Sequence, residues 1–86
     1  MDSYRIEWRA SAARELRRLD RSVIPRIHDA VRSLASNPFP HGCCKLKGSE
    51  CTFRIRVGDY RVVYDVMQGR LIVEIVRVRH RKDVYG

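Results

Sequence analysis

Apolar and polar residues alternate with a period of two across residues 53–64 of this chain. The apolar positions lie on either side of Gly58-Asp59: Phe53, Ile55 and Val57 before it, and Tyr60, Val62 and Tyr64 after it. This alternation predicts two β-strands, and a glycine–aspartate pair between them predicts a two-residue turn with positive φ. We therefore expect a hairpin in which Val57 pairs with Tyr60, Ile55 with Val62 and Phe53 with Tyr64.

The same register places two arginines opposite each other. Arg56 pairs with Arg61, and Arg54 lies two residues along on the same face. Like charges that face each other across two strands destabilise a sheet. The arrangement is typical of a site where a bound polyanion offsets the repulsion, whereas the simpler alternative is a solvated basic surface.

The N-terminal half predicts one strand and two helices. Residues 4–8 alternate, with Tyr4, Ile6 and Trp8 on one face. Apolar residues then recur at helical spacing in two segments, first Ala12, Ala13, Leu16 and Leu19, and next Val23, Ile24, Ile27, Val31 and Leu34. We expect Ser11 and Ser22 to cap the two helices, Pro25 to lie in the first turn of the second helix, and Asn37-Pro38 to end it.

The C-terminal half predicts a loop followed by a strand meander. Residues 38–51 are rich in turn formers, Gln68-Gly69 predicts a second two-residue turn, and residues 71–78 predict the last strand. With that turn, two sets of residues separate: Leu71, Val73 and Ile75 join the core face, and Val76, Val78 and His80 share the face of Arg56 and Arg61. The predicted fold is α+β in the order β-α-α-β-β-β, with an N-terminal strand, a helical hairpin on one side of the sheet and an antiparallel C-terminal strand meander.

The composition limits the protein class and the kind of partner. A length of 86 residues allows one domain, which we place at residues 1–86. The apolar runs are too short to span a membrane and the N-terminus lacks a signal sequence, so we expect a cytoplasmic protein. The formal net charge is +8, and only three of the 18 lysine and arginine residues are lysines. Arginine holds phosphate through a planar fork, so nucleic acid or another polyanion is the expected partner class.

Three cysteines, Cys43, Cys44 and Cys51, lie in the predicted loop. An odd number of cysteines, two of them adjacent, is a poor disulfide framework, and the C-x₂-C spacing of zinc sites is absent. His41 lies close enough in sequence for a metal site to be the alternative. We expect reduced thiols and no bound metal.

Five segments spread over nearly the whole chain form a series with a specific order and spacing. They are Tyr4 to Trp8, Ser11 to Leu16, Lys45-Leu46-Lys47-Gly48, Arg54 to Tyr64 and His80 to Tyr85. The series resembles the RelE/ParE superfamily of toxins from bacterial type II toxin–antitoxin systems, and its RelE branch in particular. This resemblance implies a RelE-like, microbial-RNase-like fold. It also implies a ribosome-dependent endoribonuclease, or mRNA interferase, that cuts mRNA in the ribosomal A site, inhibits translation and needs no metal or other cofactor.

The resemblance implies partners and site residues as well. The partners are a cognate antitoxin that neutralises the toxin, the ribosome with its mRNA, and operator DNA only through the antitoxin complex. The family's catalytic positions fall on Arg54, Arg56, Arg61, Arg81 and Tyr85, and its RNA or phosphate contacts fall on Lys45, Lys47, Arg79 and Lys82. The arginines would stabilise the charge that forms when the ribose 2′-OH attacks its own phosphate, and Tyr85 would stack on an unstacked base.

The resemblance does not name a general base for this sequence. Strand positions 54 and 56 are often lysine in the family, and arginine, with a pKa above about 12, is a poor base. His80 belongs to the residue type that titrates near neutral pH, so we take it as a candidate base.

Two other functions stay open at this point. A ParE-like toxin would poison DNA gyrase without cutting RNA, and a non-catalytic basic module would act only as co-repressor with its antitoxin. Relatives that poison gyrase generally lack the catalytic set, so Arg61, Arg81 and Tyr85 favour RNA cleavage. No recognition-helix pattern supports direct reading of DNA by this chain.

Overall fold

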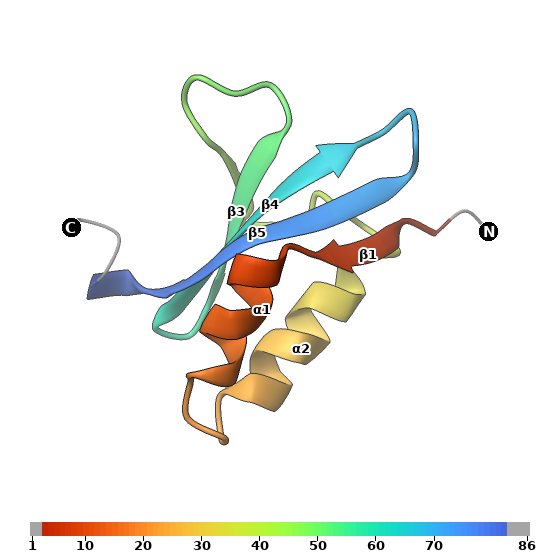
Figure 1. The fold of residues 1–86 in the computed structure, drawn as a ribbon. Coiled ribbons are helices and arrows are strands. Elements are labelled where there is room, and N and C mark those ends of the chain that lie inside the picture. Colours follow the sequence, from red (N-terminus) through yellow and green to blue (C-terminus); the bar gives the residue numbers. More distant parts are fainter. Residues whose placement is uncertain (1–2, 83–86) are drawn as a thin grey trace.

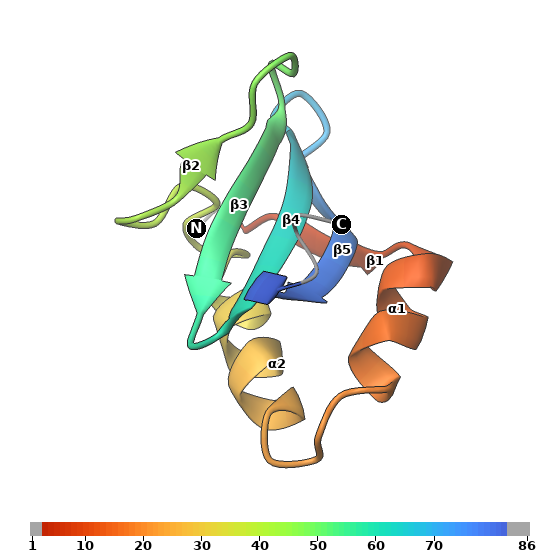
Figure 2. The same cartoon turned by 90° about the vertical axis from the view of Figure 1, so that its left-hand side faces the viewer.

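A computed structural model describes residues 3–82 of the chain (Figure 1). Its elements are β1 (Arg5–Trp8), α1 (Ala10–Arg17), α2 (Ile24–Ser33), β2 (Cys44–Lys45), β3 (Thr52–Val57), β4 (Tyr60–Met67) and β5 (Ile72–His80). The strands form one sheet in the order β1-β5-β4-β3-β2, in which β1 runs parallel to β5 and the other neighbours are antiparallel. Figures 1 and 2 show both helices on the same side of this sheet. The predicted α+β fold with a C-terminal meander is confirmed.

One short strand lies where the sequence predicted only a loop. β2 pairs with β3, with Cys44 opposite Arg54 and Lys45 opposite Phe53. Two residues are too few to show an alternation pattern. The strand exists because β3 offers an edge with unpaired backbone groups, which the loop satisfies in part.

The core lies between the helices and the sheet. α1 contributes Ala12 and Leu16, and α2 contributes Ile27 and Val31, all of them buried. The sheet contributes Ile55, Val62, Tyr64, Val66, Val73, Ile75 and Val78. Most of these are apolar positions that the periodicity predicted to face inward.

Tyr64 connects the loop after α2 to the centre of the core. Its hydroxyl donates a hydrogen bond of 2.8 Å to the carbonyl oxygen of Pro38. Burial raises the pKa of this phenol well above its ordinary value, and the neighbouring Cys43 thiol adds to the shift. The phenol therefore keeps its proton in more alkaline solution than an exposed tyrosine does, and its hydrogen bond holds the start of the loop against the sheet.

The predicted hairpin is present, and its register is confirmed throughout. The cross-strand pairs of β3 and β4 include the predicted Arg56–Arg61 pair. Gly58 in the turn has a φ of 60°. A Cβ atom at Gly58 would lie 3.0 Å from Nη2 of Arg26 on α2. The positive φ of this turn favours glycine, whereas the exposed Arg26 side chain is long enough to move away from an added Cβ.

The start of α1 differs from the prediction. The helix begins at Ala10, the preceding Arg9 provides no side-chain cap, and Ser11 lies inside the first turn. The backbone N–H of Arg9 donates to the carbonyl of Ile75 at 3.0 Å, so pairing with β5 extends up to the helix. The sheet sets where α1 begins, and the predicted Ser11 cap is wrong.

The start of α2 differs as well. The helix begins at Ile24 after Val23, again without a side-chain cap, and Pro25 lies in its first turn as predicted. Asp20 organises the preceding turn, since its carboxylate accepts the backbone N–H of Ser22 at 3.3 Å and its carbonyl accepts that of Val23 at 2.9 Å. The predicted Ser22 cap is wrong. Neither helix of the described residues is long and apolar enough to cross a membrane.

β5 contains an extra residue that changes which side chains share a face. Tyr64 pairs with Ile75, but the preceding Val63 pairs with Arg77, which leaves Val76 out of the pairing. Such a β-bulge reverses the alternation of the strand beyond it, because side chains change face at every residue.

The bulge overturns the predicted faces of Val78 and His80. Val78 pairs with Val62 and is only 2% exposed in the core. His80, two residues further along, lies on the same helix side of the sheet. The opposite face receives Arg77 and Arg79 in their place.

The turn between β4 and β5 is longer than predicted. Met67 and Ile72 pair with each other, so the loop comprises residues 68–71. Leu71 has a φ of 56° and is 40% exposed, so its predicted place in the core is wrong. Val73 and Ile75 are buried as predicted.

Candidate nucleic-acid interface

The sheet surface opposite the helices, which we call the open face, carries a row of arginines across three strands. Arg56 on β3 pairs with Arg61 on β4, and Arg61 pairs with Arg79 on β5. Arg54 and Arg77 occupy the next row along the same strands. We call this part of the open face the arginine end.

Two depressions meet at the arginine end. One, of about 300 Å³, is lined by Arg56, Arg61, Arg81 and Lys82. The other, of about 190 Å³, is lined by Gly42, Cys44, Arg54, Arg56 and Arg61. Arg56 and Arg61 line both of them. We call the five basic residues of these depressions the arginine cluster: Arg54, Arg56, Arg61, Arg81 and Lys82.

A backbone contact brings Arg81 into this cluster from the end of β5. The N–H of Arg81 donates a hydrogen bond of 2.8 Å to the carbonyl of Asp59 in the β3–β4 turn. Arg61 lies two residues after Asp59. The β3–β4 turn therefore holds both Arg61 and Arg81, which are far apart in the sequence.

The charges of the arginine cluster are not compensated within the described residues. None of its members forms an ion pair with a carboxylate of residues 3–82. Arg56 and Arg81 are exposed, whereas Arg54 and Arg61 are partly buried. Their like charges sum to a positive potential. Several guanidinium groups at one place can bind phosphate oxygens through charge-assisted, bidentate hydrogen bonds.

Arg79, a predicted phosphate contact, lies in the arginine row but has a partner. Its Nε donates to Oε2 of Glu15 on α1 at 2.9 Å. It lines neither of the two depressions of the arginine cluster. Its predicted contact with RNA stays a prediction.

His80 lies on the opposite face of the sheet from the arginine row and lines neither depression of the arginine cluster. Its ring packs edge to face against Tyr60, with ring centroids 5.1 Å apart. It lines a separate hollow of about 500 Å³ next to Leu19 and α1, on the helix side of the sheet. Its Nδ1 accepts a hydrogen bond of 3.1 Å from the backbone N–H of Lys82, so the second ring nitrogen carries the proton in the neutral ring.

The other predicted residues are distributed as follows. Lys45 pairs with Phe53, whose ring packs on Tyr64 of the core, and neither Lys45 nor Lys47 lines the two depressions. Tyr85 lies outside the described residues.

Cys44 is a residue of the site that the sequence did not indicate. It lines the second depression because β2 pairs it with Arg54. Nothing in the sequence indicated that Cys44 lies beside Arg54, because residues 38–51 were predicted as a loop. All three cysteines are free thiols, and residues 3–82 contain no group of three or more His, Cys, Asp or Glu side chains suited to a metal.

The other end of the open face, which we call the carboxylate end, carries Glu7, Glu74 and Asp65 in one row across β1, β5 and β4. Arg5 pairs with Glu7 at 3.2 Å and Arg9 with Glu74 at 3.3 Å.

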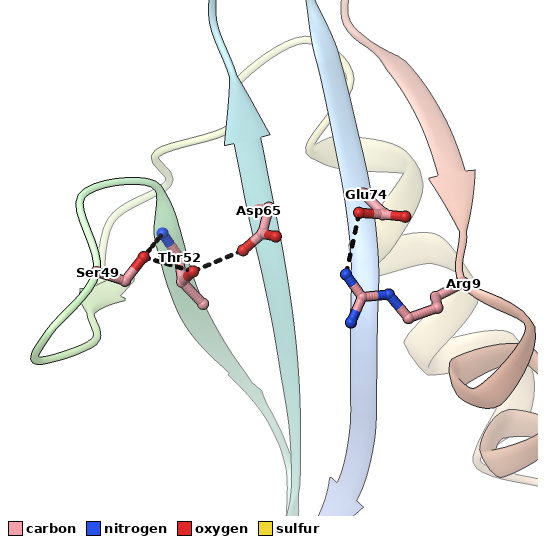
Figure 3. Close-up of polar contacts among 5 residues, drawn as sticks. All are labelled: Arg9, Ser49, Thr52, Asp65 and Glu74. Atoms are coloured by element: carbon pink, nitrogen blue, oxygen red, sulfur yellow. Dashed lines mark hydrogen bonds and ion pairs between the residues drawn. The ribbon is translucent and has the colours of Figure 1, made fainter.

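A hydroxyl chain reaches Asp65 from the neighbouring strand. Thr52 Oγ1 donates to Asp65 Oδ1 at 2.6 Å, and Ser49 Oγ donates to Thr52 Oγ1 at 2.7 Å. Figure 3 shows this chain beside the Arg9–Glu74 pair. Each carboxylate of the row therefore has a partner within the protein.

Comparison with known proteins places this chain among toxins of toxin–antitoxin systems. Residues 6–85 match the model of the family described as the ParE toxin of the type II toxin–antitoxin system, parDE. A RelE-like toxin protein of Escherichia coli is 30% identical over 87 residues, with 96% of this chain and 90% of that protein covered. Toxin RelE of Mycobacterium tuberculosis is 34% identical over 83 residues, with 95% and 86% covered.

A solved structure agrees with the sequence comparisons. The archaeal RelE–RelB complex from Pyrococcus horikoshii contains a chain that superposes with a TM-score of 0.81 at 26% identity, covering 91% of this chain and 94% of that one. That protein was crystallised with RelB, as the name of the complex states.

Proposed function

Since this chain belongs to the RelE/ParE superfamily of type II toxin–antitoxin toxins and is RelE-like, we propose that it is a ribosome-dependent endoribonuclease that cuts mRNA in the ribosomal A site. The observation that carries the proposal is the arginine cluster. Arg56 and Arg61 face each other across two strands, Arg81 joins them, and no carboxylate of residues 3–82 neutralises the three. A phosphate group of RNA is the ligand that such a surface fits.

The proposed reaction is attack of the ribose 2′-OH on its own phosphate. The bond between phosphorus and the 5′ leaving oxygen breaks as the bond to the 2′ oxygen forms, and negative charge collects on the phosphorane oxygens. The 2′ proton passes to a general base, and the 5′ oxygen takes up a proton as it leaves. Arg56 and Arg61 approach one anion from neighbouring strands, and Arg81 approaches from the end of β5. Donors already in place where charge develops contribute about 10²–10³ each to the rate of such reactions. The arginine cluster supplies that positive charge in this scheme.

The proposed partner that silences the toxin is a cognate antitoxin. The net charge of +8 and the uncompensated arginine cluster favour an acidic, amphipathic segment that folds on binding. We expect the complex to weaken with added salt and on neutralisation of acidic antitoxin residues, as measured by calorimetry. Binding that is indifferent to both would place the antitoxin on another surface. In this proposal the toxin contacts operator DNA only as part of the complex with its antitoxin.

A ParE-like function is the second candidate, because the matching family model bears that name. In that case the toxin would act on DNA gyrase and leave RNA intact. Both candidates share the fold, so the fold does not separate them; the arginine cluster favours RNA cleavage, and a measurement of activity decides.

The test is induction of the toxin alone, followed by mapping of mRNA ends and of DNA breaks. We expect translation arrest and mRNA cut within codons at ribosome-occupied positions. Equal cleavage of naked RNA at the same positions would remove the ribosome from the proposal. Gyrase-dependent DNA breaks with intact mRNA would establish the second candidate.

A further inference from the structure

Among residues 3–82, no strand pairs with the outer edge of the C-terminal half of β5, because β1 pairs with residues 72–75. α1 follows β1 directly and packs against β5. Glu15 of α1 supplies a hydrogen-bond acceptor for the backbone of β5, as a neighbouring strand would have done. Oε1 of Glu15 accepts the backbone N–H of Val78 at 2.9 Å, and Oε2 accepts Nε of Arg79 at 2.9 Å.

Glu15 is itself held in place. Ala12 and Leu16, which lie one turn before it and directly after it, are buried in the core and fix α1 against the sheet. The Glu15 side chain is 24% exposed, so its contacts are partly shielded from water. A charge-assisted hydrogen bond is shorter and stronger than a neutral one, and here both oxygens of one carboxylate are used.

The segment from Val78 to Arg81 is therefore fixed at both ends. Glu15 holds its start through Val78 and Arg79, and the carbonyl of Asp59 holds its end through the N–H of Arg81 at 2.8 Å. Arg81 contributes a guanidinium to the depression that Arg56 and Arg61 line. β4 pairs with the inner edge of the same segment from Val78 to His80, so loss of the Glu15 contacts would free its outer edge.

We propose that Glu15 is a positioning residue that fixes the end of β5 and so keeps Arg81 beside Arg56 and Arg61. Its effect on the reaction rests on the proposed RNA cleavage, whereas its effect on the position of Arg81 does not. Glu15 neutralises Arg79 at the same time, which separates this arginine from the uncompensated ones.

The test compares Glu15→Gln with Glu74→Gln. Both changes remove a carboxylate that holds an arginine against β5, but Glu74 lies at the carboxylate end, on the other side of the bulge. Glutamine at position 15 can still accept the Val78 N–H, but it presents an amide where Nε of Arg79 needs an acceptor. We expect the first-order rate of cleavage on ribosomes to fall about tenfold in Glu15→Gln, with the half-saturating toxin concentration nearly unchanged and with no loss of rate in Glu74→Gln.

A double-mutant comparison with Arg81→Ala distinguishes a positioning role of Glu15 from general destabilisation of the protein. In an Arg81→Ala background, Glu15→Gln should change the cleavage rate by less than about twofold. A full tenfold loss in that background, or equal losses in the two glutamine variants, would overturn the proposal. Glu15→Asp retains the charge on a shorter side chain and should give an intermediate rate, and it provides a second variant if Glu15→Gln unfolds.

A second measurement does not depend on RNA cleavage. The NMR resonance of Arg81 Nε–Hε, and its shift on titration with inorganic phosphate, should change in Glu15→Gln and stay as in the wild type in Glu74→Gln. If Arg81 is unaffected in both variants, Glu15 does not position it. If the wild type cuts no RNA while Arg81 responds to Glu15→Gln, the proposed function fails and the positioning role of Glu15 stands.

Discussion

The two ends of the open face both place like charges side by side across neighbouring strands, but they differ in what neutralises those charges. At the carboxylate end, Glu74 pairs with Asp65 in the sheet register, and each has its own partner, Arg9 for Glu74 and the Thr52 hydroxyl for Asp65. At the arginine end, Arg56 faces Arg61 with no carboxylate partner among residues 3–82.

This difference separates a structural arrangement from the surface that we propose to bind RNA. Like charges opposite each other cost a sheet roughly 0.2–1 kcal/mol per pair. The carboxylate end offsets that cost with internal hydrogen bonds, so it is complete without a ligand. The arginine end has no such partner among residues 3–82, and in the proposed function the phosphate of RNA would offset the cost there. Arg79 is intermediate, because Glu15 neutralises it from the helix layer.

The largest expected effect is on cleavage at the arginine end. Arg61→Ala and Arg81→Ala should each lower single-turnover cleavage on ribosomes by about 10²-fold or more, because each removes a cation placed against the phosphorane. Arg14→Ala, which removes an exposed arginine from α1, is the matched control and should keep its rate. If Arg14→Ala and Arg61→Ala lose the same amount, general charge rather than the cluster drives the reaction.

A smaller effect is expected on stability at the carboxylate end. Thr52→Val preserves the shape of the side chain but removes the hydroxyl between Ser49 and Asp65. The free energy of unfolding in urea should fall by about 1–2 kcal/mol, since a partly buried carboxylate loses a donor. Cleavage measured on the folded protein should be unchanged. A large loss of cleavage would mean that the two ends do not act independently.

The smallest effect has the opposite sign. Arg56→Gln removes one of two facing arginines without a carboxylate partner among residues 3–82, so the free energy of unfolding should rise by about 0.2–1 kcal/mol at low salt. At high salt the gain should disappear, because exposed charges are screened. A destabilised Arg56→Gln protein at low salt would show that this arginine is compensated within the protein after all.

The sequence predicted the hairpin and its charge pairing correctly because both depend on neighbouring residues. The alternation from Phe53 to Tyr64 and the Gly58 turn define the register locally, and the register alone places Arg56 opposite Arg61. The motifs along the chain also indicated the family, and the order of predicted elements indicated the α+β fold.

Features that depend on distant residues could not be predicted from the sequence. Alternation cannot reveal that β5 inserts Val76 opposite β4, and one inserted residue moved Val78 into the core and His80 to the helix side. The candidate base was therefore assigned to the wrong face, although its residue type suited the role.

For the same reason, the starts of the helices, the strand β2 and the contacts that hold the arginine end were not predicted. Each depends on residues that are far apart in the sequence. The predicted Ser11 cap is wrong because pairing of Arg9 with Ile75 sets the start of α1, and Cys44 reaches the cluster because β3 has an edge to pair with. Glu15 and Arg79 are 64 positions apart, and no local pattern joins them. The sequence by itself determined which charges the hairpin brings face to face, because turns and alternation act over a few residues. Only the tertiary structure decided which of those charges are neutralised, because the partners come from other layers of the fold.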